Sequence, residues 1–281
     1  MTQQNYRTLW TGKGVGVAVL DTGIFPHVDF DRRIAAFKDF VGGRLTPYDD
    51  NGHGTHVAGI LAGNGAASGG RYCGAAPGCH LAVVKVLDQK GNGQKQDVIK
   101  ALAWVAENRE RYNLRIVNIS VGTTERNRNH STLIQAVEEI WDLGLVVVTA
   151  AGNMGPAPGT ITAPGCSRKV ITVGSSDMIN GKDSVSGAGP TRECVVKPDI
   201  VTWGQEIVSC APGGEVNYTV KSGTSMSTPR ISGAIACMLE KDPRLTNLEI
   251  KMLLRESARD LGYSKNQQGW GAFDREKFLS L

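Results

Sequence analysis

The sequence predicts an α/β protein with a mostly parallel central sheet and helices on both faces. Two observations support this prediction. Short apolar runs without polar interruption, which are typical of strands buried on both faces, recur along the chain. Longer amphipathic segments with helical periodicity separate them, and strands that alternate with helices form parallel sheets. Because 281 residues can fill one large core, we expect a single domain over residues 1–281.

The predicted strands and helices follow in a regular order. The strands are the apolar runs at residues 15–20, 81–87, 116–120, 145–150 and 170–173. The amphipathic segments 98–111 and 132–143 predict helices, and Val98, Leu102 and Val105 share one face of the first. Functional side chains in parallel sheets gather where the strands end at their carboxyl edge. Residues that directly follow these runs are therefore the first candidates for a functional site.

Composition and charge exclude several classes of protein. Hydrophobic residues make up 41% of the chain and charged residues 21%, close to the values of ordinary globular proteins. A formal net charge of +4 is small for this length and gives no reason to expect nucleic acid as a partner. No apolar run has the length of a membrane span. The N-terminus has no apolar signal region, so we expect a cytoplasmic protein, or a secreted one if a longer precursor was trimmed. We also expect a monomer.

Six cysteines are too sparse to suggest a metal cluster. No Cys-x-x-Cys spacing is present, which argues against a structural zinc site. Cys73 and Cys79 flank a turn and could pair, but without a signal region we expect thiols rather than disulfides. Cys237 lies in an apolar helical stretch, where a buried thiol is expected.

Three short segments carry side chains with catalytic potential. Asp21 ends the first strand run, and His53 lies between glycines before a predicted helix. Ser225 precedes the predicted apolar helix 231–239, with Pro229 suited to the first turn of that helix. Taken alone, each segment is a weak indication. Asp21 could cap a turn, and Ser225 could be an N-cap.

A second histidine raises the question of a metal pair. His53 and His56 are three residues apart, whereas the metalloprotease signature has histidines four apart with a glutamate between them. No such glutamate is present. We therefore expect His56 to be a packed structural histidine and not a zinc ligand.

Taken together, the three segments resemble a known family. Residues 21–23, 53–59 and 223–229, in the order Asp, His, Ser, resemble the subtilisin-like serine proteases (subtilases, peptidase family S8). The resemblance extends from about Gly12 to Phe273. The loops at 47–53 and 63–70 look like those of the AprX-type branch of bacterial subtilases, which is associated with the cytoplasm. The resemblance implies a three-layer subtilisin-like fold and a serine endopeptidase.

The resemblance also implies a role for each reactive residue. Ser225 would attack the peptide carbonyl, His53 would take and return the proton, and Asp21 would orient the imidazole. Asn153, which follows a predicted strand, would hold the oxyanion together with the Ser225 N–H. This chemistry requires no cofactor.

Substrate would bind as an extended strand beside two segments of the chain. The resemblance places these at Gly91, Asn92, Gly93 and at Ser120, Val121, Gly122, which could equally be a hairpin turn and a strand end. The specificity pocket would be walled by Val121, Gly122, Ala150, Ala151, Gly152 and Thr162, followed by Ala163 and Pro164. No acidic residue stands in these walls. We therefore expect broad specificity for protein and peptide substrates, with a preference for apolar or aromatic residues before the cleaved bond.

Calcium is the usual structural ion of this family. Asp29 falls where the resemblance implies a calcium ligand. The loop that would supply the other ligands is the glycine-rich segment 63–70, where Asn64 alone offers a side-chain oxygen near its start. Calcium needs six or more oxygen ligands. We therefore expect a weak structural calcium site or none.

Two alternatives to an active endopeptidase are considered. The first is a catalytically silent or regulatory peptide-binding protein on the same scaffold, and the presence of all the expected catalytic residues argues against it. The second is an esterase, for which the Gly-x-Ser-x-Gly motif is missing. Relatives that use a glutamate in place of the histidine are excluded by His53.

Overall fold

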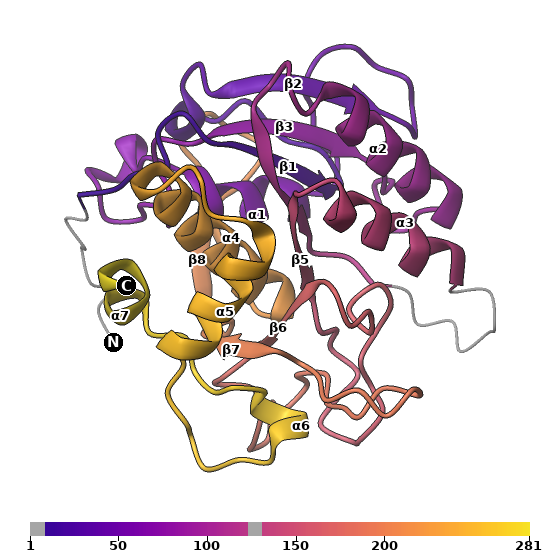
Figure 1. The fold of residues 1–281 in the computed structure, drawn as a ribbon. Coiled ribbons are helices and arrows are strands. Elements are labelled where there is room, and N and C mark those ends of the chain that lie inside the picture. The colour runs from indigo at the N-terminus through magenta and orange to yellow at the C-terminus, as the bar shows by residue number, and fades with distance from the viewer. Residues whose placement is uncertain (1–8, 123–130) are drawn as a thin grey trace. The chain divides into compact units, whose positions relative to one another are not determined.

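The computed structural model describes residues 9–122 and 131–281. It confirms the α/β class, with seven mostly parallel strands in the main sheet and helices packed against them (Figure 1). The chain divides into two compact units. The first comprises residues 1–117, 207–221 and 232–244, and the second comprises residues 118–206, 222–231 and 245–281. In the part of the chain that is described, no helix is both long enough and apolar enough to cross a membrane.

The first unit contains three parallel strands. They are β1 (Gly16–Asp21), β2 (Ile34–Asp39) and β3 (His80–Lys85), in the order β2-β3-β1 (Figure 1). β1 pairs with β3 along its whole length, so that Asp21 lies opposite Lys85. Every residue of β1 is buried, as expected for an apolar run without polar interruptions.

Two helices cover these strands. α1 (His53–Ala62) and α2 (Lys95–Asn108) both pack against β1, on opposite sides in Figure 1. α2 confirms the helix predicted over residues 98–111, with a shift toward the N-terminus. The short 3₁₀ helices η1 (Val28–Phe30) and η2 (Ala66–Ser68) lie in the same unit. An antiparallel hairpin of β8 (Ile207–Cys210) and β9 (Tyr218–Lys221) packs against α1 through β8.

The second unit contains the parallel strands β5 (Val146–Ala150), β6 (Ile171–Ser175) and β7 (Ile200–Thr202), in the order β5-β6-β7. α3 (Ser131–Asp142) packs against β5 and confirms the second predicted helix. α5 (Asn247–Ser257) begins with a capping box formed by Thr246 and Glu249. α6 (Lys265–Gln268) and α7 (Arg275–Ser280) follow, and α5 packs against α7.

Two elements each contain one of the points at which the chain passes between the units. They are β4 (Leu114–Ile119) and α4 (Thr224–Lys241). The prediction that Pro229 occupies the first turn of its helix is wrong, because α4 begins at Thr224 and Pro229 lies inside it. Since proline has no N–H, it cannot donate to the carbonyl of Ser225 four residues earlier. Because α4 begins at Thr224, Ser225 is its second residue and lies in the first turn.

Candidate active site

Asp21 and His53 form a hydrogen-bonded pair in the first unit. Asp21 is the last residue of β1, and His53 is the first residue of α1. Asp21 Oδ1 lies 2.7 Å from His53 Nδ1 and also accepts the Thr22 N–H at 2.7 Å. The Asp21 carboxylate is fully buried, whereas a quarter of the His53 side chain is exposed. A carboxylate on Nδ1 fixes the tautomer that leaves the Nε2 lone pair available as a base.

The pKa of His53 reflects two opposing effects. Burial disfavours the charged imidazolium, but the negative charge of Asp21 and its hydrogen bond outweigh burial and raise the pKa. Lys221 acts against this rise and Asp49 adds to it, both through their charges. Asp21 Oδ2 is buried and has no hydrogen-bond partner among the described residues. The pair is thus electrostatically suited to accept a proton at Nε2.

The backbone around His53 requires glycine. A Cβ at Gly54 would collide with the carbonyl of Gly23 and approach Asp21 Cβ to 3.2 Å. Gly52, which precedes α1, has a φ of +92° that side chains rarely adopt. These glycines allow α1 to start directly beside the end of β1.

His56 has the structural role expected for it. Its ring is fully buried, and Nε2 lies 3.0 Å from the Ile207 carbonyl and 3.2 Å from that of Thr219. Burial lowers the pKa of His56 to about 4 despite these hydrogen bonds. A neutral imidazole therefore joins α1 to the hairpin of β8 and β9.

Asp49 is a residue of the site that the sequence reasoning missed. Its Oδ1 accepts the Thr22 hydroxyl at 2.9 Å, and also the backbone N–H groups of Asn51 and Gly52 at 3.1 and 2.8 Å. Its Oδ2 accepts both the N–H and the hydroxyl of Thr55, at 2.9 and 2.6 Å. Although burial alone would raise its pKa, these hydrogen bonds lower the pKa of Asp49. One buried carboxylate thus ties the residue after Asp21 to the first turn of the helix that carries His53.

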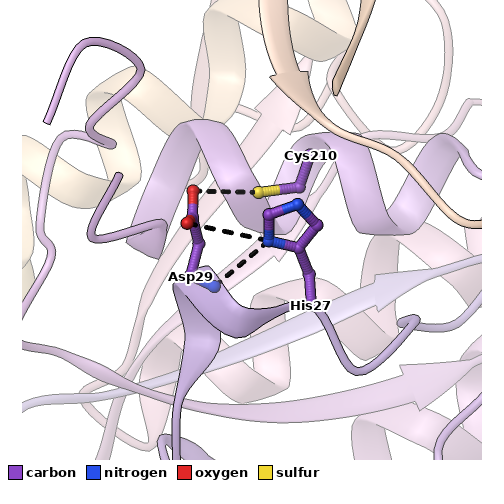
Figure 2. Close-up of side chains that lie close together, drawn as sticks. All are labelled: His27, Asp29 and Cys210. Atoms are coloured by element: carbon purple, nitrogen blue, oxygen red, sulfur yellow. Dashed lines mark hydrogen bonds and ion pairs between the residues drawn. The ribbon is translucent and has the colours of Figure 1, made fainter. Parts of the chain in front are cut away.

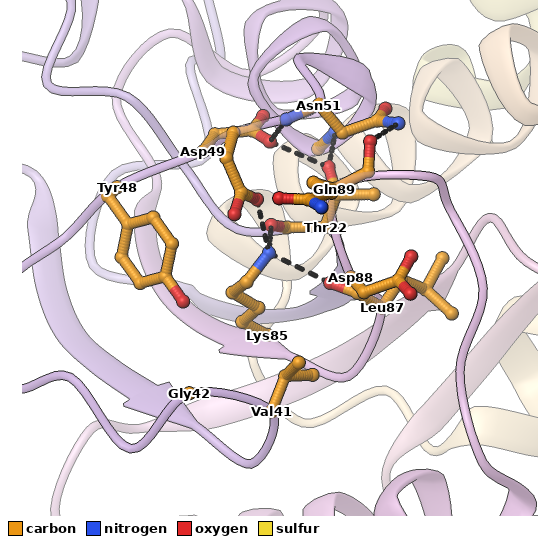
Figure 3. A network of polar contacts seen from close by, with 12 residues as sticks. Thr22, Val41, Gly42, Tyr48, Asp49, Asn51, Lys85, Leu87, Asp88 and Gln89 are labelled. Carbon is orange, nitrogen blue, oxygen red and sulfur yellow. Dashed lines mark hydrogen bonds and ion pairs between the residues drawn. The ribbon is translucent and has the colours of Figure 1, made fainter.

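Lys85 supports the same region from the neighbouring strand. Its side chain is almost fully buried, and Nζ donates to the carbonyls of Thr22 and Leu87 at 2.6 and 2.8 Å (Figure 3). A third hydrogen bond of 2.7 Å joins it to the partly exposed carboxylate of Asp50. Lys85 therefore fixes the backbone at Thr22, directly after Asp21, and at Leu87, just after the end of β3.

Ser225 lies in the first turn of α4, within the second unit. It is 9% exposed, and its Oγ donates to the carbonyl of Ser120 at 2.7 Å. The first N–H groups of a helix have no intrahelical acceptor. No acceptor among the described residues takes the Ser225 N–H. This N–H is available to a bound anionic oxygen.

Asn153 follows β5 and is oriented by Thr224. Its Oδ1 accepts both the N–H and the hydroxyl of Thr224, at 2.9 and 3.1 Å. The Thr224 hydroxyl in turn accepts the Gly152 N–H at 3.2 Å. With Oδ1 occupied, the Nδ2 hydrogens remain as donors beside the start of α4. Thr224 was not selected from the sequence, although its place directly before Ser225 is visible there.

Thr162 lies against two of the other segments predicted to wall the specificity pocket. Thr162 donates its N–H to the Ala151 carbonyl at 3.0 Å. A Cβ at Gly152 would lie 2.6 Å from the Thr162 side chain, and one at Gly122 would collide with its hydroxyl. The segments after β4 and β5 are thus brought together on the same threonine.

The segment Gly91, Asn92 and Gly93 forms an exposed turn between β3 and α2. Asp88 accepts the Gly91 N–H at its carbonyl, and its own N–H donates to the Asn92 carbonyl at 2.7 Å. Asp88 Oδ1 also accepts the Asn92 N–H at 2.9 Å. The turn interpretation of this segment therefore describes its structure. Its role toward substrate stays a prediction.

The surroundings of Asp29 do not match a calcium site. Asp29 is fully buried, Oδ1 accepts the Ala67 N–H at 2.9 Å and Oδ2 accepts the Tyr218 hydroxyl at 2.7 Å. The other side chains against the carboxylate are the imidazole of His27 and the thiol of Cys210 (Figure 2). Asn64 Oδ1, the oxygen considered in the glycine-rich loop, accepts the Ala66 N–H instead. Calcium prefers a shell of oxygen ligands, whereas these neighbours are N–H, O–H and S–H groups and an imidazole.

Comparison with known proteins identifies the family to which this fold and site belong. The family model for the subtilase family, Peptidase S8, matches residues 12–271. The chain therefore belongs to the subtilase family.

Individual relatives agree with this assignment. The chain is 43% identical over 277 residues to serine protease AprX of Bacillus subtilis strain 168, covering 90% of this chain and 62% of the relative. It is 38% identical over 266 residues to subtilisin Savinase of Lederbergia lenta, covering 95% of this chain and 91% of the relative. A solved cold-adapted subtilisin-like serine proteinase superposes with a TM-score of 0.79 at 31% identity, covering 96% of this chain and 90% of that structure. The predicted fold is thus confirmed.

Proposed function

We propose that this protein is a serine endopeptidase in which Asp21, His53 and Ser225 form the catalytic triad. The observation that carries the proposal is the 2.7 Å contact between Asp21 Oδ1 and His53 Nδ1, with Asp21 buried and His53 partly exposed. This pair presents an imidazole nitrogen as a general base. Membership of the subtilase family supports Ser225 as the group on which that base would act.

In the proposed reaction His53 Nε2 takes the proton of the Ser225 hydroxyl as Oγ attacks the carbonyl carbon of the substrate. The tetrahedral intermediate then collapses, and the proton passes from His53 to the leaving amine. A water molecule then attacks the acyl-enzyme while His53 takes its proton. The second tetrahedral intermediate collapses, His53 returns the proton to Ser225 Oγ, and the acyl group is released. Asp21 stabilises the imidazolium in each half without taking the proton itself.

The oxyanion of the intermediate would be held by the Ser225 N–H and Asn153 Nδ2. Thr224 occupies the Oδ1 of this amide with two hydrogen bonds, so the donor end is preorganised. Preorganised donors stabilise developing charge without reorganisation at the moment of reaction. Thr224 is in this respect a positioning residue for Asn153.

We infer that the substrate is a protein or peptide bound as an extended strand. Ser120, Val121 and Gly122, directly after β4, would pair with its backbone on one side, and the turn at Gly91, Asn92 and Gly93 would do so on the other. The pocket of small residues around Thr162 favours apolar or aromatic side chains over Arg and Lys. The resemblance to AprX-type subtilases supports action in the cytoplasm, and the small net charge of +4 gives no reason to expect nucleic acid as a partner. We propose that the protein acts as a monomer. Catalysis in the subtilase family needs no cofactor.

The decisive experiment is hydrolysis of casein and of chromogenic peptides at neutral pH, with and without a calcium chelator. Ser225→Ala is expected to fold normally and to lose turnover to background. Ser222→Ala, a serine of the same loop that accepts the Glu206 N–H, is the matched control and should keep activity within a few-fold. A folded wild-type chain that neither hydrolyses peptides nor reacts with a serine-directed phosphonate would contradict the proposal and favour the regulatory alternative.

A second variant tests the oxyanion assignment. Asn153→Ala is expected to lower kcat with little change in KM, because the donor acts on the intermediate more than on bound substrate. The corresponding asparagine of subtilisin is the measured reference for this effect, and we adopt its size of about a hundred- to a thousandfold. Full activity in Asn153→Ala would rule out this role.

A further inference from the structure

His27, Asp29 and Cys210 form a buried cluster with the geometry of three metal ligands. One ligand atom from each, Nδ1, a carboxylate oxygen and Sγ, lies within 4.8 Å of the other two. Oδ2 of Asp29 is 3.6 Å from Sγ, and Oδ1 is 3.7 Å from the imidazole Nδ1 (Figure 2). Tetrahedral zinc, with bonds of about 2.0–2.3 Å, places neighbouring ligand atoms roughly 3.3–3.6 Å apart. The two distances from the Asp29 carboxylate, one from each oxygen, are within a few tenths of an ångström of this spacing, and one ligand atom of each residue lies within 4.8 Å of the other two.

The imidazole of His27 is oriented for ligation. Its Nε2 lies 3.0 Å from the Asn217 carbonyl, which places the ring proton on Nε2. Nδ1 then carries the ring's lone pair, 3.7 Å from Asp29 Oδ1. This lone pair accepts the Asp29 N–H at 3.1 Å, so a bound cation would replace that hydrogen bond. Metal-binding histidines are held in this way, with the second ring nitrogen donating to a carbonyl or carboxylate.

Charge and ligand type select the cation. The carboxylate of Asp29 and a thiolate at Cys210 carry two negative charges, which a divalent cation neutralises inside an otherwise costly buried site. Thiolate and imidazole prefer zinc-like ions, whereas calcium prefers oxygen. The Tyr218 hydroxyl, 2.7 Å from Asp29 Oδ2, is a further oxygen beside the cluster.

We propose that His27, Asp29 and Cys210 bind a thiophilic divalent cation of the Zn²⁺ class. On binding, the cation replaces the proton of the Cys210 thiol, and this proton leaves to solvent while a metal–sulfur bond forms. No electron is transferred. The cation then links η1 to the end of β8, two segments of the first unit that are 181 residues apart between Asp29 and Cys210.

Cobalt is the probe, because a thiolate on Co²⁺ gives a charge-transfer absorption in the near ultraviolet. The background carries Ser225→Ala against self-digestion, and Cys73→Ser with Cys194→Ser to remove the two exposed thiols. One equivalent of Co²⁺ should produce the band, and Zn²⁺ should abolish it by displacement. Cys210→Ser should remove the band, whereas Cys79→Ser, which removes another buried thiol of the same unit, should leave it.

No band in the background protein, or a band that survives Cys210→Ser, would overturn the proposal. Far-ultraviolet circular dichroism without metal shows whether each variant is folded. His27→Gln provides a second variant, in which Zn²⁺ affinity should fall at least about tenfold and the rise in Tm caused by Zn²⁺ should shrink accordingly. None of these readouts involves peptide hydrolysis, so the result is independent of the proposed function.

Discussion

At the residue scale, the protonation of His53 is governed by its charged neighbours. Asp21 raises its pKa, Asp49 adds to the effect and Lys221 opposes it. A general base must be neutral to accept a proton, so the pKa of His53 sets the lower pH limit of activity. These neighbours thus control when the base is active.

We expect kcat/KM to fall as the pH drops through the pKa of His53, at a pH above the ordinary histidine value of about 6.5. Lys221→Gln removes a positive charge that lowers the pKa of His53. The acidic limb of the pH profile, where activity falls as His53 is protonated, should therefore move to still higher pH. Lys100→Gln, on the exposed face of α2, should leave it in place. The measurement is the pH profile of peptide hydrolysis at low ionic strength, where charges are least screened. A limb that moves down in Lys221→Gln would contradict the electrostatic account.

Asp49 offers a second prediction at this scale. Asp49→Asn replaces one acceptor oxygen by a donor that faces the N–H and hydroxyl groups already bound there, which should cost about 1–3 kcal/mol of folding stability. Because those groups position His53, kcat should fall while KM changes little. The adjacent Asp50→Asn, which affects a partly exposed carboxylate bonded to Lys85, is the control. Equal kcat values in the two variants would show that Asp49 serves stability alone.

Sequence patterns were sufficient for some residues and not for others. Asp21, His53 and Ser225 could be selected because short motifs surround them, and Asn153 because it follows a recognisable strand. Tyr218 and Cys210 could not be assigned to Asp29, since the contact depends on side-chain packing across a long stretch of sequence. The calcium expectation rested on the position of Asp29 alone, whereas the atoms around it come from β8, β9 and the loop at Ala67.

At the element scale, a lysine of α5 is bound to the backbone before β6. Lys251 Nζ donates to the carbonyls of Arg168, Lys169 and Val170 at 2.9 to 3.1 Å, and lies 3.7 Å from Asp199. Burial outweighs the attraction of Asp199 and lowers the pKa of Lys251 to about 8. The charged form is therefore disfavoured by folding.

This lowered pKa predicts a pH dependence of stability. Between about pH 8 and 10 an unfolded lysine still holds its proton while folded Lys251 has lost it, so unfolding takes up a proton and stability rises with pH. Relative to Lys251→Met, the wild type should gain about 1–2 kcal/mol between pH 7.5 and 9.5. Urea unfolding in a Ser225→Ala background at both pH values gives the difference. No relative gain would mean that Lys251 keeps its ordinary pKa in the fold.

Element prediction succeeded where the local pattern was strong. β1, β3, β4, β5 and β6 match the five predicted runs to within a few residues. β2 was missed because it is only partly buried and lacks a continuous apolar run, and β7 because it has three residues. β8 and β9 have four residues each, β9 has no buried residue, and the two strands pair only with each other. Such strands are defined by tertiary contacts that a local pattern does not record.

At the scale of the whole molecule, neither compact unit is a continuous stretch of chain. The chain passes from one unit to the other after residues 117, 206, 221, 231 and 244. A cut at any one of these points would divide at least one unit between the two fragments. This interleaving supports the proposal of a single catalytic domain over residues 1–281.

We expect one cooperative unfolding transition in calorimetry of the Ser225→Ala protein, with equal calorimetric and van't Hoff enthalpies. Zn²⁺ should be held constant or removed, because a bound cation shifts Tm by itself. Two resolved transitions would show that the units unfold independently and would contradict the single-domain proposal.

The distribution of cysteines has a practical consequence for measuring motion in this protein. None of the six forms a disulfide, and the two exposed thiols, Cys73 and Cys194, belong to different units. A donor and an acceptor fluorophore attached through maleimide chemistry would therefore sit one on each unit without any engineered cysteine. Energy transfer between the two dyes would report in real time whether the distance between them changes as a peptide is bound and released.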